Sequence, residues 1–199
     1  MPKIIDHNKR KIQIAEATWK VIVTEGLEQA SVRKIAKEAG LSVGALRHYF
    51  STQSELFAFS MKLVSDRVKK RATEKKYDGP PIEVMQEILS EFLPINDDQY
   101  IEMEVWLVFS AKTLVNSELK SLSKTVYQEM RSVVEHVIQS LVDLQMAKDN
   151  LDKHLEIERL YALIDGLALH SILHPDELST DKMQATLKYH LKSLCKYAE

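Results

Sequence analysis

Residues 31–50 read Ser-Val-Arg-Lys-Ile-Ala-Lys-Glu-Ala-Gly-Leu-Ser-Val-Gly-Ala-Leu-Arg-His-Tyr-Phe. Ser31 stands where the N-cap of a helix accepts a hydrogen bond from a backbone N–H near residue 34. The apolar residues after it recur at i, i+3, i+4 and i+7, the spacing of one helical face: Val32, Ile35, Ala36 and Ala39. Gly40 follows, where glycine takes a left-handed conformation at little cost, and Ser42 caps a second short helix. Two short helices joined by a tight turn predict a helix-turn-helix.

The run Ser-Val-x-x-Ile-Ala-x-x-Ala-Gly-Leu-Ser-x-Gly-x-Leu-x-x-Tyr-Phe resembles the DNA-binding region of the TetR family of bacterial transcriptional regulators. It lies behind one amino-terminal helix and ahead of a long fourth helix, as in that family, and the match covers about residues 8–75. The resemblance implies an all-α fold. An N-terminal three-helix domain with the helix-turn-helix would be joined by a long fourth helix to a C-terminal helical domain for ligand binding and dimerisation.

A break in the chain at Tyr77-Asp78-Gly79-Pro80-Pro81 suggests where the two domains meet, because Gly-Pro-Pro does not continue a helix. We expect a DNA-binding domain at 1–76, with its motif at about 31–50 and its linking helix at about 52–76, and an effector-binding and dimerisation domain at 77–199. The first part contains 16 basic and 8 acidic residues and the second 11 basic and 21 acidic, which gives formal charges of +8 and −10. A basic amino-terminal part suits a polyanion such as DNA.

Apolar periodicity and helix-ending residues predict the remaining helices. Thr52 and Glu55 have the Thr-x-x-Glu spacing of a capping box at the start of the linking helix. Trp19 lies on the apolar face of the first helix, where we expect it in the core. The other expected helices cover residues 8–25, 82–93, 99–114, 118–146, 151–173 and 180–197.

The resemblance assigns the DNA contacts to nine positions of the motif: Ser31, Arg33, Lys34, Ser42, Val43, Gly44, Ala45, Arg47 and His48. Arg33 matches a position that reaches a base edge in relatives, and an arginine there can bond guanine O6 and N7 together. Two positions depart from the family pattern. Arg47 replaces a tyrosine that usually follows the leucine of the recognition helix, and Gln53 replaces a lysine that often opens the fourth helix. The first change puts the specificity of relatives in doubt, and the second removes one cationic phosphate contact.

Aromatic and apolar residues at helical spacing give a candidate effector pocket: Phe92, Met103, Trp106, Phe109, Tyr127 and Met130. Such stripes also occur as plain core, and both interpretations stay open. Trp106 with Glu102 or Glu104 nearby would suit a cationic ligand held over the ring, as in choline-responsive members of the family.

The last two helices carry broad apolar faces that could be core or interface. Relatives use their final helices for a two-fold dimer, so the expected interface includes Leu160, Leu163, Leu167, Leu187 and Leu191. A homodimer also suits the motif, because one helix-turn-helix reads only half of a palindrome.

Other classes of protein find little support in the sequence. One cysteine, Cys195, excludes an intramolecular disulfide and multi-cysteine metal sites, and we expect neither a cofactor nor a metal. His170 and His174 share a helix face but lack the glutamate of a His-Glu-x-x-His motif, and no sequence pattern indicates an enzyme. No apolar run approaches a membrane span, so a cytoplasmic protein is expected.

The sequence therefore predicts a DNA-binding transcriptional regulator, a ligand-responsive repressor that binds a palindromic operator as a homodimer. Its partners would be double-stranded DNA and a small-molecule effector that the sequence does not identify. Two alternatives remain: a non-specific architectural DNA-binding protein, and an all-helical small-molecule-binding or enzymatic module that only mimics the motif.

Overall fold

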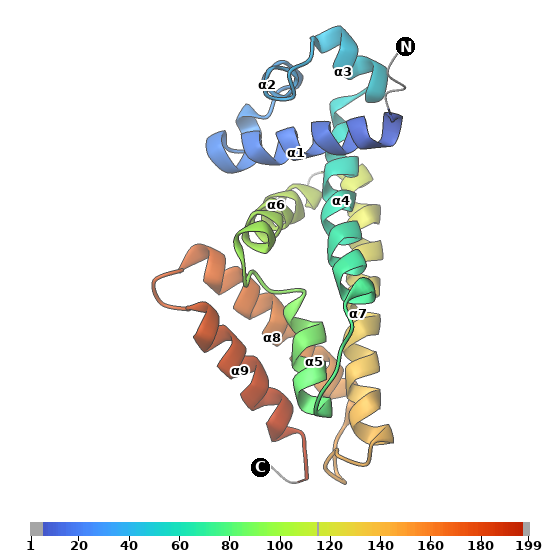
Figure 1. Cartoon of the computed structure of the whole chain (residues 1–199), viewed down its shortest axis with the longest axis vertical. Helices are drawn as coiled ribbons and strands as arrows, with labels where there is room; N and C mark the ends of the chain where they lie inside the picture. Colours follow the sequence, from blue (N-terminus) through green and yellow to red (C-terminus); the bar gives the residue numbers. More distant parts are fainter. Residues whose placement is uncertain (1–5, 115, 197–199) are drawn as a thin grey trace. The chain divides into compact units, whose positions relative to one another are not determined.

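A computed structural model describes residues 6–114 and 116–196, and in these ranges the chain forms nine α-helices, one short 3-10 helix and no strand longer than an isolated bridge (Figure 1). The all-α prediction is confirmed. The helices are α1 (His7–Glu25), α2 (Val32–Glu38), α3 (Val43–Tyr49), α4 (Gln53–Glu74), α5 (Pro81–Ser90), α6 (Asp97–Thr113), α7 (Ser117–Asp143), α8 (Lys153–Leu173) and α9 (Thr180–Ser193), with the 3-10 helix at Leu27–Gln29.

Each helix expected from the sequence is present, and the largest differences are at carboxyl ends. Helix α9 stops at Ser193, earlier than the predicted end at residue 197, which lies outside the described residues. The segment after it pairs with the loop after α7 instead: the Lys148 N–H donates to the Leu194 carbonyl at 2.9 Å, and the Lys196 N–H to the Met146 carbonyl at 2.8 Å. These long-range bonds replace the last helical turn.

The described residues fall into two compact units. The first combines the residues up to Arg67 with Glu104–Ser123. Its buried core joins α1, the helix-turn-helix and the amino-terminal part of α4, with side chains that include Ile14, Trp19, Ile35, Leu46, Phe50, Leu56, Met61 and Phe109. Trp19 is buried as expected, and its Nε1–H donates to the Ser60 carbonyl at 3.0 Å. This bond ties α1 to α4 behind the motif.

The second unit combines Val68–Met103 with the chain from Lys124 onward. Its core is formed by α5, α7, α8 and α9, with side chains that include Met85, Leu89, Val134, Ile138, Leu160, Ile164, Leu187 and Leu191. Helices α5 and α9 lie side by side in this unit, where the Gln86 Nε2–H donates to Gln184 Oε1 at 2.7 Å. The predicted boundary at residue 77 separates a DNA-binding part from an effector-binding and dimerisation part, and it stays a prediction.

Candidate DNA interface

Helix α2 begins and ends through the local interactions that the sequence predicted. The Ser31 hydroxyl accepts the Lys34 N–H at 3.4 Å and caps the helix. Gly40 has a φ of +64°, in the left-handed region. Around it the Leu41 N–H donates to the Ala36 carbonyl at 2.8 Å and the Gly40 N–H donates to the Lys37 carbonyl at 3.2 Å, the paired bonds of a Schellman motif. The tight turn of the helix-turn-helix is therefore confirmed.

The recognition helix α3 turns one side inward and the other outward. The Ser42 hydroxyl accepts the Ala45 N–H at 3.1 Å, and Leu46 is buried in the core of the first unit. Val43 is 42% exposed, although a valine is usually sheltered from water. A Cβ at Gly44 would meet only the Ser42 hydroxyl, 3.9 Å away. The chain's own packing does not require this glycine, so its open surface is available to an outside partner.

The structure brings five of the predicted contacts together around one depression. It has a volume of about 650 Å³ and is lined by Ser31, Arg33, Lys34, Ser42 and Val43, with Ala36, Lys37 and Leu41 between them. Gly44 and Ala45 continue along α3 from the rim residues Ser42 and Val43. The exposed starts of α2 and α3 thus form one concave face.

Arg47 and His48 are held at the other end of α3. The Arg47 Nη1–H donates to the Ser51 carbonyl at 2.7 Å, which occupies the guanidinium in the turn between α3 and α4. The His48 ring lies edge-on to Tyr49 at 5.6 Å and to His7 at 6.2 Å, and His7 also lies 4.8 Å from Tyr49. No pattern in the sequence indicated that the start of α1 packs against the recognition helix.

The predicted cations of the site differ in how free they are. The Lys34 ammonium lies 2.6 Å from a Glu25 carboxylate oxygen and donates to Gln29 Oε1 at 2.9 Å. Arg33 is exposed and has no hydrogen-bond or ion-pair partner within 6–114 and 116–196. An arginine that its own chain leaves unpaired keeps all its donors for a ligand. Arg33 is thus better placed than Lys34 or Arg47 to bind DNA without first breaking an internal contact.

The beginning of α4 is fixed to the motif by side-chain caps. The Thr52 hydroxyl accepts the Glu55 N–H at 3.0 Å, and the Glu55 carboxylate accepts the Ser51 N–H at 2.8 Å. The predicted capping pair is present, with the second bond made one residue earlier than in the standard box. The Gln53 Nε2–H donates to the Ala30 carbonyl at 2.8 Å. Gln53, which departs from the family pattern, thus ties α4 to the residue before the N-cap of α2.

The predicted effector residues are divided between the two units, and the effector pocket stays a prediction. Phe109 is buried in the core of the first unit with Trp106 packed against it, and Phe57 lies 5.6 Å from the Phe109 ring. In the second unit, Phe92, Met103 and Met130 pack against its own core. Tyr127 is half-exposed, and its ring lies 4.9 Å from Tyr161, a residue that sequence reasoning missed.

The suggested acids near Trp106 also differ from each other. Glu102 is buried, and one of its carboxylate oxygens lies 2.7 Å from Arg71 Nη1, so an internal cation already pairs with it. Glu104 is half-buried, and burial raises the pKa of its carboxyl. The guanidinium of Arg71 is therefore the cation beside Glu102, where the sequence had suggested a cationic ligand.

Four of the five leucines predicted for a dimer interface lie inside the second unit. Leu160, Leu167, Leu187 and Leu191 are buried in its core, and Leu163 is partly buried against it. A side chain with almost no exposed surface cannot supply the contact area of an interface. Four of the predicted interface leucines therefore belong to the core that α5, α7, α8 and α9 form within this chain, and the interface itself stays a prediction. The apolar side chains that remain exposed on α8 and α9 are others: Leu155, Leu169, Leu173 and Tyr189.

The end of α8 and the composition of the helices bear on metal sites and membrane spans. The His170 and His174 rings lie 6.3 Å apart at the end of α8, and among the residues the structure describes no three His, Cys, Asp or Glu side chains are placed to hold a metal ion. Within the same residues, no helix is long and apolar enough to span a membrane.

Family models match both parts of this chain. Residues 14–58 match the model of bacterial regulatory proteins of the tetR family, and residues 81–196 match that of the carboxy-terminal part of BetI-type transcriptional repressors. The chain is 47% identical to the HTH-type transcriptional regulator PksA of Bacillus subtilis, over 98% of this chain and 94% of that one. It is 28% identical to the HTH-type transcriptional regulator BetI of Vibrio atlanticus, over 96% and 94%.

Solved structures have the same fold. A transcriptional regulator from Rhodococcus sp. Rha1 superimposes with a TM-score of 0.80 at 27% identity, over 92% of this chain and 95% of that one. A transcriptional regulator from Saccharomonospora viridis, solved in complex with choline, superimposes with a TM-score of 0.84 at 20% identity, over 93% and 96%. The second likeness is one of fold.

Proposed function

This chain belongs to the TetR family of bacterial regulatory proteins, and from that membership we propose that it is a ligand-responsive repressor that binds a palindromic operator as a homodimer. The family is one of DNA-binding transcriptional regulators of the helix-turn-helix type, and this chain is one of them. Operator, oligomeric state, effector and a cytoplasmic location are the parts that we propose. No enzymatic activity is part of the proposal.

The unpaired Arg33 beside the exposed start of α3 is the observation that carries the DNA-binding proposal. We assign base reading to Arg33, with Val43 and Ala45 offering apolar contact to thymine methyl groups. Ser31, Ser42 and Gly44 present hydroxyls and backbone to phosphates. Lys34, Arg47 and His48 are assigned supporting contacts, because each is already engaged within the chain.

Selection of bound fragments from a random duplex library tests this assignment. The wild-type protein should enrich a palindrome, and Arg33→Ala should lose sequence information at one position in each half-site, with about 1–3 kcal/mol of discrimination removed. Lys37→Ala is the matched control, because Lys37 lines the same depression from α2. It should weaken binding to all sequences alike. Unenriched DNA from the wild-type protein would favour the architectural alternative, and no bound DNA would contradict the proposal.

The exposed apolar residues of α8 and α9 support the homodimer. Leu155, Leu169 and Leu173 on α8 are 62%, 38% and 58% exposed. Exposed Ala162 lies midway between Leu155 and Leu169, so the four residues follow one another at intervals of seven, seven and four, which is the spacing of one helical face. Tyr189 is exposed on α9. Leu169→Glu should yield a monomer in analytical ultracentrifugation, whereas Leu144→Glu, at an exposed leucine after α7, should leave a dimer. A wild-type monomer at all concentrations would refute this part.

A small organic cation is the effector class that we propose. The support is the BetI-type model over the second part of the chain, the choline bound to a protein of the same fold, and the paired rings of Tyr127 and Tyr161 with Asp165 one turn further along α8. Tyrosine faces and a carboxylate both attract a cation. The effector would favour the conformation with lower operator affinity. It can shift the equilibrium between the two conformations only by as much as its own affinities for them differ.

Choline is the first probe for this effector. Titration with choline should lower the affinity of the wild-type protein for its selected operator, and Tyr161→Ala should weaken that response. Leu144→Ala, at an exposed leucine after α7 and outside the proposed interface, is the control and should respond as the wild type does. An unchanged operator affinity in saturating choline would exclude choline, and the same outcome with other quaternary ammonium compounds would exclude the class.

A further inference from the structure

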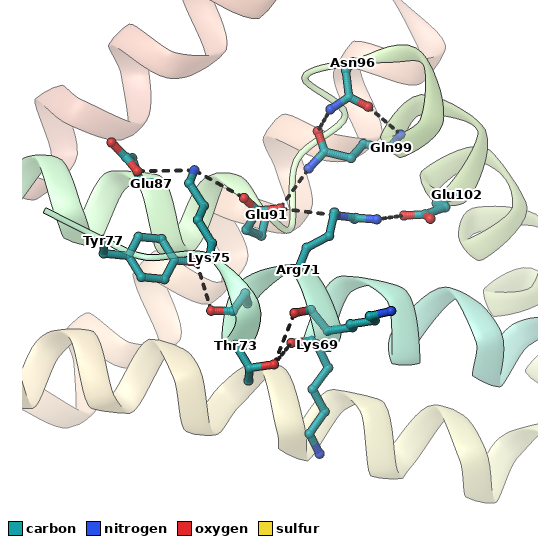
Figure 2. Close-up of polar contacts among 12 residues, drawn as sticks. Lys69, Arg71, Thr73, Lys75, Tyr77, Glu87, Glu91, Asn96, Gln99 and Glu102 are labelled. Atoms are coloured by element: carbon teal, nitrogen blue, oxygen red, sulfur yellow. Dashed lines mark hydrogen bonds and ion pairs between the residues drawn. The ribbon is translucent and has the colours of Figure 1, made fainter.

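The two ends of α4 are attached to the protein in different ways. From Leu56 to Val64 the helix supplies apolar side chains to the core of the first unit. Beyond Val64, no residue of α4 belongs to either buried core within the described ranges. The carboxy-terminal end of α4, Val68–Glu74, lies in the second unit and is held there mainly by charged groups. Figure 2 shows these groups.

Arg71 bridges two buried carboxylates, one directly after α5 and one on α6. Its Nε lies 3.2 Å from Glu91 Oε2, just after α5, and its Nη1 lies 2.7 Å from Glu102 Oε2 on α6 (Figure 2). Glu91 is 7% exposed and Glu102 is 3% exposed, whereas Arg71 is about one third exposed. One guanidinium from α4 thus approaches two carboxylates that water hardly reaches.

Further polar contacts fix the geometry of this group. Lys75, which follows α4, lies 3.2 Å from a Glu87 carboxylate oxygen and 3.5 Å from a Glu91 oxygen. On the other side, the Gln99 Nε2–H donates to Glu91 Oε2 at 3.2 Å, and the Asn96 Nδ2–H donates to Gln99 Oε1 at 2.7 Å. Glu91 is therefore oriented by three side chains, those of Arg71, Lys75 and Gln99, so the position of Arg71 is constrained in more than one direction.

Charged hydrogen bonds of this kind define a position better than apolar packing does. Apolar burial is roughly proportional to area and has little directional preference of its own, so it specifies position only through the fit of side-chain shapes. A guanidinium that bridges two carboxylates requires particular distances and planes. A buried ion pair also adds little net stability compared with uncharged groups of the same size, because desolvation offsets the attraction. Its main effect here is to specify where the end of α4 lies.

We propose that Arg71 is a positioning residue for DNA binding, whose guanidinium holds the end of α4 in one register on α5 and α6 by bridging Glu91 and Glu102. This rests on the proposed function, because α4 is the helix that directly follows the recognition helix α3 in the chain. The bridge is a latch: the first unit keeps its apolar core when it is broken, and only the placement of Val68–Glu74 in the second unit is lost.

A charge-free variant separates positioning from stability. Arg71→Met combined with Glu91→Gln and Glu102→Gln removes all three charges with little change in volume. It should fold with a Tm close to that of the wild type, since such replacements are often neutral or stabilising. Hydrogen exchange at residues 68–74 should become faster while residues 56–64 stay protected. Affinity for the selected operator should fall about tenfold, within the usual range of coupling between sites.

Two further variants make the test specific. Lys62→Met with Asp66→Asn removes an exposed ion pair from the first part of the same helix and should change neither exchange nor operator affinity. Arg71→Lys keeps the charge but cannot span both carboxylates with one fork. It should lose operator affinity like the charge-free variant, and full affinity with lysine would overturn the bridging role.

The outcomes of this experiment distinguish the latch from the function on which it rests. A charge-free variant that binds the operator as the wild type does, with unchanged exchange at 68–74, would overturn the latch. A wild-type protein that selects no operator would contradict the proposed function instead. In that case the exchange comparison between 68–74 and 56–64 still tests whether Arg71 fixes the end of α4.

Discussion

The two parts of α4 show how one helix can be held by different kinds of interaction. Its first part inserts Leu56, Phe57, Met61 and Val64 into an apolar core, whereas its last turns contribute Arg71 to a group of buried carboxylates. Apolar burial supplies stability with little directional preference, and charged hydrogen bonds supply direction with little net stability. Changes in the first part should therefore affect unfolding most, and changes in the last turns should affect position most.

The largest effect is expected from the apolar part. Met61 is completely buried, so Met61→Ala removes transfer free energy and leaves a cavity, and it should lower the free energy of unfolding by about 2–5 kcal/mol. Chemical denaturation measures this loss. The neighbouring exposed Lys62→Ala is the control and should stay within about 0.5 kcal/mol of the wild type. A loss below about 1 kcal/mol for Met61→Ala would mean that the core closes around the gap.

Truncation of the charged part should have a smaller but clear effect. Arg71→Ala leaves Glu91 and Glu102 buried without their bridging guanidinium, and we expect a loss of about 2 kcal/mol. This is less than for a fully buried pair, because Arg71 is partly exposed and water screens it. Addition of Glu102→Gln to Arg71→Ala should recover part of the loss in the same denaturation experiment. No recovery would indicate that the lost packing of the arginine stem dominates.

Two threonines near opposite ends of α4 sharpen the comparison further. The Thr52 hydroxyl caps the start of the helix, and Thr52→Ala should cost about 1 kcal/mol because the Glu55 N–H loses its partner. The Thr73 hydroxyl donates to the Lys69 carbonyl within the helix. Thr73→Ala should be neutral or slightly stabilising, since alanine has the higher helix propensity. Equal effects of the two substitutions on Tm would contradict the capping role of Thr52.

The smallest effect concerns a charge placed among apolar groups on α8. Asp165 lies one turn from Ala162 and Leu169, and partial burial raises the pKa of its carboxyl to about 6. The folded state therefore holds this proton over a pH range in which the unfolded chain has released it. The contribution of Asp165 to stability falls as pH rises from about 4 to about 6 and stays constant above that.

Asp165→Asn removes this pH-dependent loss. The variant should be more stable than the wild type at pH 8, by less than about 1 kcal/mol because the side chain keeps open surface and is screened by water. At about pH 2.5, well below the ordinary aspartate pKa of about 4, the carboxyl is protonated in both states and the difference should disappear. Thermal unfolding at the two pH values measures it. A larger difference at the acidic pH would contradict the assigned direction.

Local patterns in the sequence were sufficient for the motif and its caps. Ser31, Ser42 and Thr52 were identified because an N-cap needs only the residues that follow it within one turn. Gly40 was identified because a left-handed turn favours glycine whatever surrounds it. The same rules placed the helix ends within a few residues, except where the chain after α9 bonds to a distant loop.

The sides of α8 could not be assigned in the same way. The apolar residues of α8 are distributed around all of its sides, so their spacing alone does not tell which of them face inward. Leu160 and Leu167 proved to be core, while Leu155, Leu169 and Leu173 remain exposed. Sequence reasoning chose the interior leucines for the interface because the residues of a broad apolar face do not show whether that face packs within the chain or against a second one.

The polar group around Arg71 was also missed, because its members are far apart in the chain. The basic end of α4 has an ordinary explanation in the helix dipole, and neither Glu91 nor Glu102 stands out among the acidic residues of the second part. Only folding shows that both carboxylates are buried and share one guanidinium.

The sequence by itself determined the all-α fold, the helix-turn-helix with its caps and glycine turn, and the family, because these depend on interactions within one or two helical turns. The tertiary structure decided which cations of the motif are free, which leucines of α8 face outward, and which carboxylates Arg71 bridges. Each of these depends on which distant segments meet. Residue spacing along the chain carries little information about that.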